Sequence, residues 1–395
     1  MSREEQADVV IIGGAIVGSS VATFLAARPD FDGRVVVVER DPTFRTSSTT
    51  LSAASIRLQF STPLNIEISR FGLEVVRHPD AWLAVDGETP DVGFIENGYL
   101  FLATPAGLTT LEANHAVQRR LDVPVVLLDP EELHTRFPWL RTDDLAGASL
   151  GTADEGWFDA HALLQGFRRR ARATGVEERQ GEVVGLEMRS SRVEGVRLAD
   201  GSRIGASWVV NAAGPRAASI AAMAGIELPV RPRKRNVFHF AAPISLGAAP
   251  LTIDPSGIYV RPEGPNFLAG FSPLAGDPDP DTMDLQVDRA AFEAHVWPAM
   301  AHRIPAFDQV RLLDAWAGHY EVNTLDHNAI VGPHPRISNL LLANGFSGHG
   351  LQQAPAVGRG LAEWIATGRY ETLDLAPLGY ARIERKEPIR ELNVV

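Results

Sequence analysis

The chain has 395 residues, of which 45% are hydrophobic and 22% are charged, and its formal net charge is −12. These values are ordinary for a globular protein of two or three domain-sized units with a sizeable core. The negative charge disfavours nucleic-acid binding, which needs concentrated Lys and Arg. We interpret the one basic run, 231–235 (RPRKR), as a solvated loop or strand entrance. Because there is no cysteine, disulfides, thiolate metal ligands and thiol nucleophiles are excluded.

The amino-terminal segment 1–8 is polar and lacks the apolar core of a signal peptide. No later stretch is long and apolar enough to cross a bilayer. We therefore expect a cytoplasmic protein without an integral membrane segment.

The first elements in chain order predict a βαβ unit. Residues 8–12 (DVVII) form a β-branched run typical of a strand that is buried on both faces. Residues 19–27 have helical spacing and stop before Pro29, and a second apolar run at 35–38 ends in Glu39. This order fits within the ~30 residues that a βαβ unit needs.

From about Gly93 the pattern changes to short alternating strands, such as 98–102, mixed with helical stretches such as 108–121. Residues 181–213 predict two strands, a turn and a buried strand, 226–324 are strand-rich, and the last seventy residues return to strand, turn and helix. The pattern predicts an α/β (α+β overall) fold, in which a mostly antiparallel β substrate domain with flanking helices interrupts a Rossmann-type domain. We assign 1–92, 152–216 and 325–395 to the cofactor domain, and 93–151 and 217–324 to the substrate domain.

The turn after the first strand carries a dinucleotide fingerprint. This fingerprint has glycine at its first, third and sixth positions. Here Gly13 and Gly18 occupy the first and sixth positions, and Ala15 occupies the third. Glu39 follows Gly18 at the end of the second strand, where a carboxylate accepts hydrogen bonds from a ribose. Any adenine dinucleotide suits this turn, so the choice of cofactor depends on the rest of the chain.

Several separated segments resemble the D-amino-acid oxidase/sarcosine oxidase superfamily of FAD enzymes. They are the small-residue loop 47–57 (SSTTLSAASIR), 208–215 (WVVNAAGP), 316–320 (WAGHY) with 326–332 (DHNAIVG), and 344–355 (NGFSGHGLQQAP). The resemblance runs from about residue 8 to 383. Within the superfamily, 59–61 (QFS), the Gly345–Gln353 run and 368–375 are most similar to the branch that holds the FAD-dependent oxidoreductase domain-containing protein linked to respiratory complex I assembly.

The resemblance implies one FAD held between two glycine turns. A helix predicted from near Gly350 to Thr367 directs the partial positive charge of its N-terminus at the negative charge of a reduced flavin. The implied cofactor-binding residues are Gly13, Gly14, Ala15, Ile16, Val17, Gly18, Glu39, Arg40, Ser47, Ser48, Thr49, Ser52, Ala53, Val183, Ala212, Ala213, Gly214, Gly318, Gly345, Phe346, Ser347, Gly348, His349, Gly350, Leu351 and Gln352.

The resemblance further implies hydride transfer from the carbon next to nitrogen in a small amine, and the expected substrate is a free or N-substituted amino acid. Arg57 matches the arginine that anchors a substrate carboxylate, and its fork pairs with both oxygens. Tyr320 matches a tyrosine of the substrate pocket. The other candidate site residues are Tyr259, Gln352 and His349, of which we read His349 as a hydrogen bonder on the cofactor side; Arg261 and His239 also come into question.

Departures from the family pattern sharpen these expectations. Gly318 stands where monomeric sarcosine oxidase has a flavin-linking Cys, and Leu51 where dimethylglycine dehydrogenase-like proteins have a flavin-linking His, so we expect non-covalent FAD. Gln352 replaces a second carboxylate-binding Lys. Leu268 aligns near the Lys that promotes reaction with oxygen, which favours a dehydrogenase that passes electrons to a quinone or an electron-transfer flavoprotein.

Three alternatives stay open at this point. The chain could be a flavin-bearing assembly or interaction protein with little turnover, or a D-amino-acid dehydrogenase. An NAD-dependent dehydrogenase would leave the 345–353 motif unexplained. We expect no metal site, because the eleven histidines form no HExxH-like pair.

Overall fold

The computed structural model describes residues 5–273 and 276–392. Its first sheet has eight strands in the order β17-β18-β11-β1-β2-β8, with β10 and β9 added antiparallel beside β11. The central strands β18, β11, β1, β2 and β8 are parallel. The strands are β1 (Glu5–Ile12), β2 (Val35–Glu39), β8 (Glu177–Gln180), β9 (Val183–Arg189), β10 (Arg192–Leu198), β11 (Arg203–Asn211), β17 (Ile330–Pro333) and β18 (Leu340–Asn344).

Strand β1 shows why its residues form a central strand. Val9 and Ile11 belong to the core on one face of the sheet, and Val10 and Ile12 belong to the core on the other. A strand with cores on both faces has no polar face, which explains its continuous apolar run.

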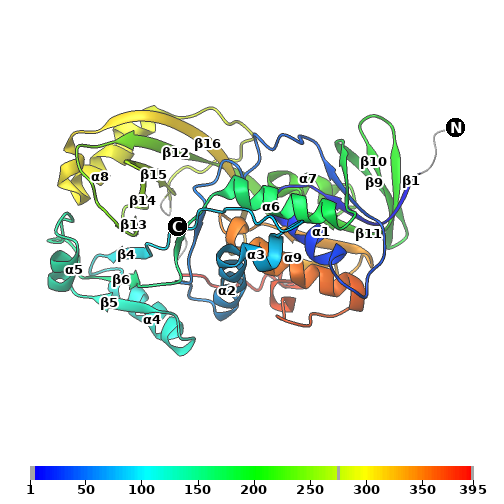
Figure 1. The fold of residues 1–395 in the computed structure, drawn as a ribbon, viewed down its shortest axis with the longest axis horizontal. Helices are drawn as coiled ribbons and strands as arrows, with labels where there is room; N and C mark the ends of the chain where they lie inside the picture. The colour runs from blue at the N-terminus through cyan, green and yellow to red at the C-terminus, as the bar shows by residue number, and fades with distance from the viewer. Residues whose placement is uncertain (1–4, 274–275, 393–395) are drawn as a thin grey trace.

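Helices cover this sheet on both faces. One core contains side chains of α1 (Ile16–Ala26), α2 (Pro63–Arg77), α6 (Ala160–Ala173) and α9 (Gly350–Thr367), which lie together in Figure 1. The other core contains α7 (Ala217–Ala222), which follows the short 3₁₀ turn η1 (Gly214–Arg216). The remaining helices are α3 (Pro79–Leu83), α4 (Leu108–Arg120), α5 (Pro130–Arg136), η2 (Phe292–Val296), α8 (Trp297–Arg303), η3 (Pro305–Asp308), η4 (Ala376–Leu378) and α10 (Ala381–Arg385).

The second sheet also has eight strands, in the order β16-β12-β15-β14-β13-β4-β6-β5, and every pair except β13 with β4 is antiparallel. It lies on the opposite side of the molecule from β9 and β10 (Figure 1). Its strands are β4 (Tyr99–Ala103), β5 (Val125–Leu128), β6 (Gly147–Gly151), β12 (Val230–Ala241), β13 (Leu251–Ile253), β14 (Ile258–Glu263), β15 (Asn266–Phe271) and β16 (Arg311–Asn323); β3 (Ser55–Ile56) and β7 (Gly156–Trp157) form a separate pair.

The predicted fold class is confirmed by this architecture. The strands of the first sheet all come from the segments expected for the cofactor domain, and those of the second from the segments expected for the substrate domain. The exact domain boundaries remain a prediction. Strand β12 connects the two regions, because Val230 belongs to a core of the first sheet whereas Phe238 and Phe240 belong to the core of the second.

The basic run 231–235 differs from its expected form, since it lies within β12. Its charged groups form ion pairs with the segment 276–288: Lys234 Nζ lies 2.7 Å from Asp284 Oδ2, and Arg235 Nη1 lies 2.7 Å from Asp279 Oδ1. Arg233 Nη1 lies 3.0 Å from Asp281 Oδ1. The acidic partners follow more than forty residues later, which is why the run looked unpartnered in the sequence.

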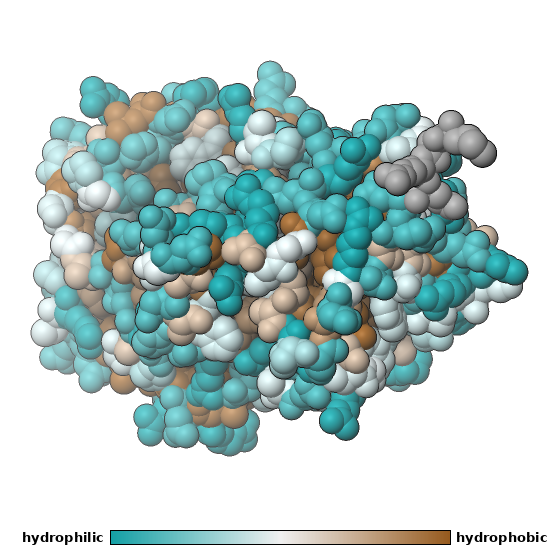
Figure 2. All heavy atoms as spheres, turned by 45° about the vertical axis from the view of Figure 1, so that its right-hand side comes forward, coloured by the Kyte–Doolittle hydropathy of each residue, from teal (hydrophilic) through white to brown (hydrophobic). Residues whose placement is uncertain are grey.

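Within the described residues, no helix is both long and apolar enough to cross a bilayer. The face drawn in Figure 2 is mostly hydrophilic, with apolar residues scattered between the polar ones. The cytoplasmic location stays a prediction.

Candidate cofactor and substrate site

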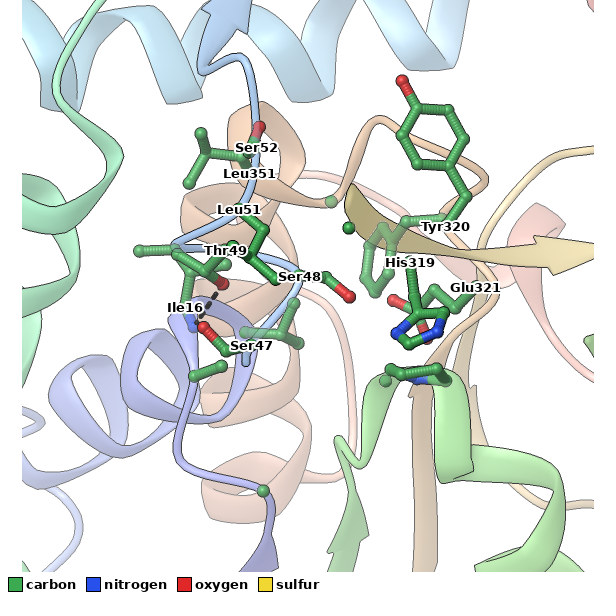
Figure 3. Close-up of a pocket in the computed structure, with 18 of the residues that line it drawn as sticks. Ile16, Ser47, Ser48, Thr49, Leu51, Ser52, His319, Tyr320, Glu321 and Leu351 are labelled. Carbon is green, nitrogen blue, oxygen red and sulfur yellow. Dashed lines mark hydrogen bonds between the residues drawn. The ribbon is translucent and has the colours of Figure 1, made fainter. Parts of the chain in front are cut away.

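A cavity of about 670 Å³ lies between the two sheets. Strand ends and glycine turns of the first sheet line it on one side, and β4, β12, β13, β14 and β16 of the second sheet line it on the other. The loop 44–55 forms part of the wall between them (Figure 3). Residues far apart in the sequence therefore meet in one cavity.

The β1–α1 turn requires glycine at two positions. Gly13 has φ +100°, and a Cβ there would lie 2.4 Å from the carbonyl oxygen of Ala212. A Cβ at Gly18 would lie 1.9 Å from the carbonyl oxygen of Gly13. The carboxylate of Glu39 accepts a hydrogen bond from the backbone N–H of Gly14, at 2.8 Å. The turn and the end of β2 are thus fixed to each other at the start of α1, where free N–H groups favour a diphosphate.

The loop 47–53 lies beside this turn. Thr49 Oγ1 accepts a hydrogen bond from the N–H of Ile16, at 3.3 Å, which Figure 3 marks as a dashed line. The indole of Trp316 in β16 donates to the carbonyl of Leu51, at 3.0 Å. A Cβ at Gly318 would lie 3.0 Å from the Cβ of Leu51, so the loop and β16 approach each other closely.

The second glycine turn precedes α9. Gly345 and Gly348 have φ of +71° and +97°, and a Cβ at Gly348 would lie 2.4 Å from the ring of Tyr320. Ser347 is buried, and its Oγ accepts a hydrogen bond from the N–H of Asn323, at 3.0 Å. His349 is the N-cap residue of α9, and no side chain of residues 5–273 or 276–392 caps this helix end. The first turn of α9 faces the cavity, since Gly350, Leu351 and Gln352 line it.

Arg57 is 3% exposed and lines the same cavity. Its N–H donates to Gln352 Oε1 at 2.8 Å, and its Nη1 donates to the carbonyl of Gln59 at 2.7 Å. Its Nη2 lies 3.0 Å from His349 Nε2, and its guanidinium lies 4.3 Å from the centre of the Phe60 ring. Burial, and then the charge of Arg57, lowers the pKa of His349 to about 3, so this imidazole is neutral and accepts from Arg57.

Glu155 holds the backbone next to Arg57. Its carboxylate is fully buried and accepts hydrogen bonds from the N–H groups of Leu58 and Gln59, at 2.7 and 2.9 Å, and from the Gln59 side chain at 2.8 Å. Burial raises the pKa of Glu155 to about 7, while these hydrogen bonds lower it. A side chain at Gly151 would collide with this carboxylate, at 1.8 Å.

Three tyrosines from the second sheet line the cavity: Tyr99, Tyr259 and Tyr320. Burial raises the pKa of each phenol, so all three are protonated hydrogen-bond donors near pH 7. The guanidinium of Arg235 lies 5.3 Å from the centre of the Tyr320 ring. The site therefore combines a buried cation with several neutral donors.

The structure brings most of the expected site residues together. All five substrate-site candidates line the cavity. The cofactor candidates line it as well, except Gly14, Gly18, Gly345 and Ser347, which belong to the two glycine turns without bordering the cavity. Arg261 does not line the cavity and donates instead to the carbonyl of Ala53, at 3.0 Å. His239 and Leu268 do not line it either.

Sequence reasoning missed Tyr99, Glu155, His319 and Glu321. Glu321 lies opposite the second glycine turn, its carboxylate accepts from the N–H of Gly345 at 3.2 Å, and burial raises its pKa to about 8. His319 and Glu321 flank Tyr320 in a predicted strand, and this pattern could have indicated both of them as site residues. Glu155 had none, because its partners lie about one hundred residues away.

The residues that line the cavity are suited to bind FAD. Three polar atoms of cavity-lining residues, Ser48 Oγ, Arg235 Nε and His319 Nε2, are buried and have no hydrogen-bond partner among the described residues. Buried polar groups are normally satisfied, so these atoms indicate a ligand with polar groups along its length. Glu39, the Gly13 turn and the α9 N-terminus are suited to a ribose, a diphosphate and an anionic ring. The described residues form no cluster of three or more potential metal ligands.

Comparison with known proteins supports an FAD site. A family model described as FAD dependent oxidoreductase matches residues 8–364. The FAD-dependent oxidoreductase domain-containing protein 1 of Xenopus laevis is 42% identical over 99% of this chain and 85% of its own length. The glycine oxidase of Geobacillus kaustophilus is 27% identical over 95% of this chain and 97% of its own length.

Among solved structures, the L-proline dehydrogenase from P. horikoshii superposes with a TM-score of 0.86. It is 28% identical and covers 98% of this chain and 100% of its own length. The relationship that the motifs indicated is therefore confirmed over nearly the whole sequence. The chain belongs to the FAD dependent oxidoreductase family, and FAD is its cofactor.

Proposed function

We propose that this protein oxidises the C–N bond of a small free or N-substituted amino acid and that the imine product hydrolyses. The observation that carries the proposal is the position of Arg57, a buried guanidinium that lines the cavity between the loop 47–53 and the first turn of α9. A buried cation next to a cofactor site is suited to a substrate carboxylate, because its planar fork pairs with both oxygens.

The chain's own residues bind and orient the substrate in this proposal. Bound FAD supplies the acceptor for the hydride. Arg57 holds the carboxylate, and Gln59 and His349 fix the guanidinium. The hydroxyls of Tyr259 and Tyr320 would donate hydrogen bonds to the substrate from the facing sheet. The N-terminus of α9, which lines the cavity, would stabilise the negative charge of a reduced cofactor.

The names of the relatives support this substrate class, since they include an L-proline dehydrogenase, a glycine oxidase and the sarcosine dehydrogenase of Mus musculus. The electron acceptor is a second part of the proposal. Among the described residues, no lysine lines the cavity, so a primary ammonium that would favour superoxide next to the flavin is missing. We propose a dehydrogenase that delivers electrons to a quinone or an electron-transfer flavoprotein.

Anaerobic reduction of the bound flavin tests the reaction. A panel of N-methyl, N-carboxyalkyl, D- and L-amino acids should contain compounds that bleach the flavin, whereas the matching amines without a carboxylate should not. No bleaching by any member would contradict the proposed reaction and favour a flavin-bearing protein with little turnover. Mixing the reduced protein with air should give slow re-oxidation, and fast re-oxidation would make it an oxidase.

A further inference from the structure

His319 lies at a point of the cavity that the substrate proposal does not use. It is 5% exposed, it comes from β16, and its ring borders the pocket beside Glu321 in Figure 3. Its Nε2 is buried without a hydrogen-bond partner among the described residues. Leaving such an atom unsatisfied costs about 1–3 kcal/mol, so without a ligand this group lowers the unfolding free energy of the chain.

Ser48 repeats this observation from the other wall. It belongs to the loop beside the N-terminus of α1, and its Oγ is also buried and unpartnered among the described residues. In Figure 3 its hydroxyl points toward the side of the pocket that His319 and Glu321 form. Two unsatisfied polar groups on separate elements therefore border the same space.

The charge state of His319 narrows the choice of ligand atoms. Burial lowers the pKa of His319, while the backbone of Asp284 acts in the opposite direction. The ring is therefore neutral near pH 7 and offers one donor and one acceptor nitrogen. Hydroxyl groups and phosphate oxygens match such a ring, whereas the apolar edge of a flavin does not.

The segment 276–288 holds the ring in place. Lys234 Nζ donates to Asp284 Oδ2 at 2.7 Å and to the carbonyl of Gln286 at 2.8 Å, which fixes the backbone that lies against His319. The basic run in β12 thereby gains a role, since Lys234 is a positioning residue for the imidazole.

We propose that the His319 imidazole and the Ser48 hydroxyl bind the ribityl–diphosphate stretch of FAD from opposite sides. The assignment depends on FAD binding and is independent of the substrate. It adds a residue to the cofactor site that neither glycine turn contains.

The test uses the full chain and two readouts, the Kd for FAD from equilibrium dialysis and the thermal unfolding midpoint as a function of FAD concentration. His319→Leu is expected to raise the Kd about tenfold, the size of one lost hydrogen bond. The midpoint extrapolated to zero FAD should change little, because the loss of the hydrogen bond to the Asp284 backbone is offset by the removal of an unsatisfied buried nitrogen. His319→Gln keeps a donor and an acceptor and should bind FAD within about threefold of the parent chain.

His334 provides the matched control. It is also buried, and its Nε2 has no partner within the described part of the chain. It does not line the cavity, and its Nδ1 accepts from the backbone of Ile337 at 3.2 Å. His334→Leu should lower the FAD-free midpoint and leave the Kd unchanged.

Three results would overturn the proposal. They are an unchanged Kd in His319→Leu, a fall of its FAD-free midpoint as large as that of His334→Leu, and a tenfold loss of affinity for lumiflavin, which lacks the ribityl and phosphate groups. If His319→Leu does not fold, the comparison of His319→Gln with His319→Asn decides, and equal tenfold losses in both would count against the assignment.

Discussion

Arg57 is the residue on which the substrate proposal depends. Arg57→Met removes a charge-assisted interaction worth about 1.5–3 kcal/mol, so the KM for an amino acid should rise roughly 10- to 100-fold. Anaerobic flavin reduction at varied substrate concentration measures this change. Arg359 is a suitable control, because it is half-buried over the Phe71 ring and lies outside the cavity. Arg359→Met should leave the KM unchanged, and an equal rise in both variants would refute a specific role of Arg57.

The two carboxyls with raised pKa values predict a pH dependence of stability. Glu155 and Glu321 keep a proton up to about pH 7 and 8, whereas an unfolded Glu loses it near 4.5. The folded chain therefore binds more protons in this window, and the unfolding free energy falls as the pH rises through it, by at most about 1.4 kcal/mol per pH unit for each group.

Urea unfolding at pH 5.5 and 8 measures that slope. Glu321→Gln should flatten it, because the variant has no proton to lose. The exposed Glu131 is the control, and Glu131→Gln should keep the slope of the parent chain. A slope that is equally steep in Glu321→Gln would show that this carboxyl does not titrate there.

At the scale of elements, the loop before β7 carries a prediction. Glu155→Ala would leave the N–H groups of Leu58 and Gln59 and the Gln59 amide without their acceptor, in a fully buried place. The unfolding free energy should fall by about 3 kcal/mol or more, which urea titration would show. Glu263 is an exposed carboxylate at the end of β14, and Glu263→Ala should cost clearly less.

The segment 276–288 carries another prediction, because it is attached to β12 through ion pairs that are partly exposed. Such pairs are weak, at about 0–1 kcal/mol each, and salt screens them. Arg235→Gln removes both hydrogen bonds to Asp279, so limited proteolysis should cut this segment faster in the variant. In 0.5 M salt the parent chain should approach the variant's rate; equal rates at low salt would contradict the attachment.

The same elements show how far the sequence could predict this protein. The order of strand, glycine turn, helix and terminal Glu39 is local, so the cofactor half of the site followed from it. The charges of β12 were misread because their partners come from a segment more than forty residues away. Glu155 and His319 could not be assigned, since their roles depend on burial and on neighbours that only the folded chain supplies. Arg57 was found through family resemblance, not through local pattern.

For the whole molecule, the mode of cofactor attachment is a testable expectation. Gly318 and Leu51 offer no nucleophile, and the chain has no cysteine, so FAD should be held without a covalent bond. Acid precipitation of the yellow protein should leave all of the flavin in the supernatant. Adding FAD should also raise the unfolding midpoint in a concentration-dependent way. Flavin that stays in the pellet would contradict this expectation.

Strand β12 belongs to the cores of both sheets, through Val230 at one end and Phe238 and Phe240 at the other. β16 runs beside it for its whole length, and the isolated bridge from Val322 to Phe346 ties that ribbon to the glycine turn before α9. Because both halves share this two-stranded ribbon, the hydrophobic core of each half is incomplete without the other half. We therefore expect that each half, expressed separately, fails to fold.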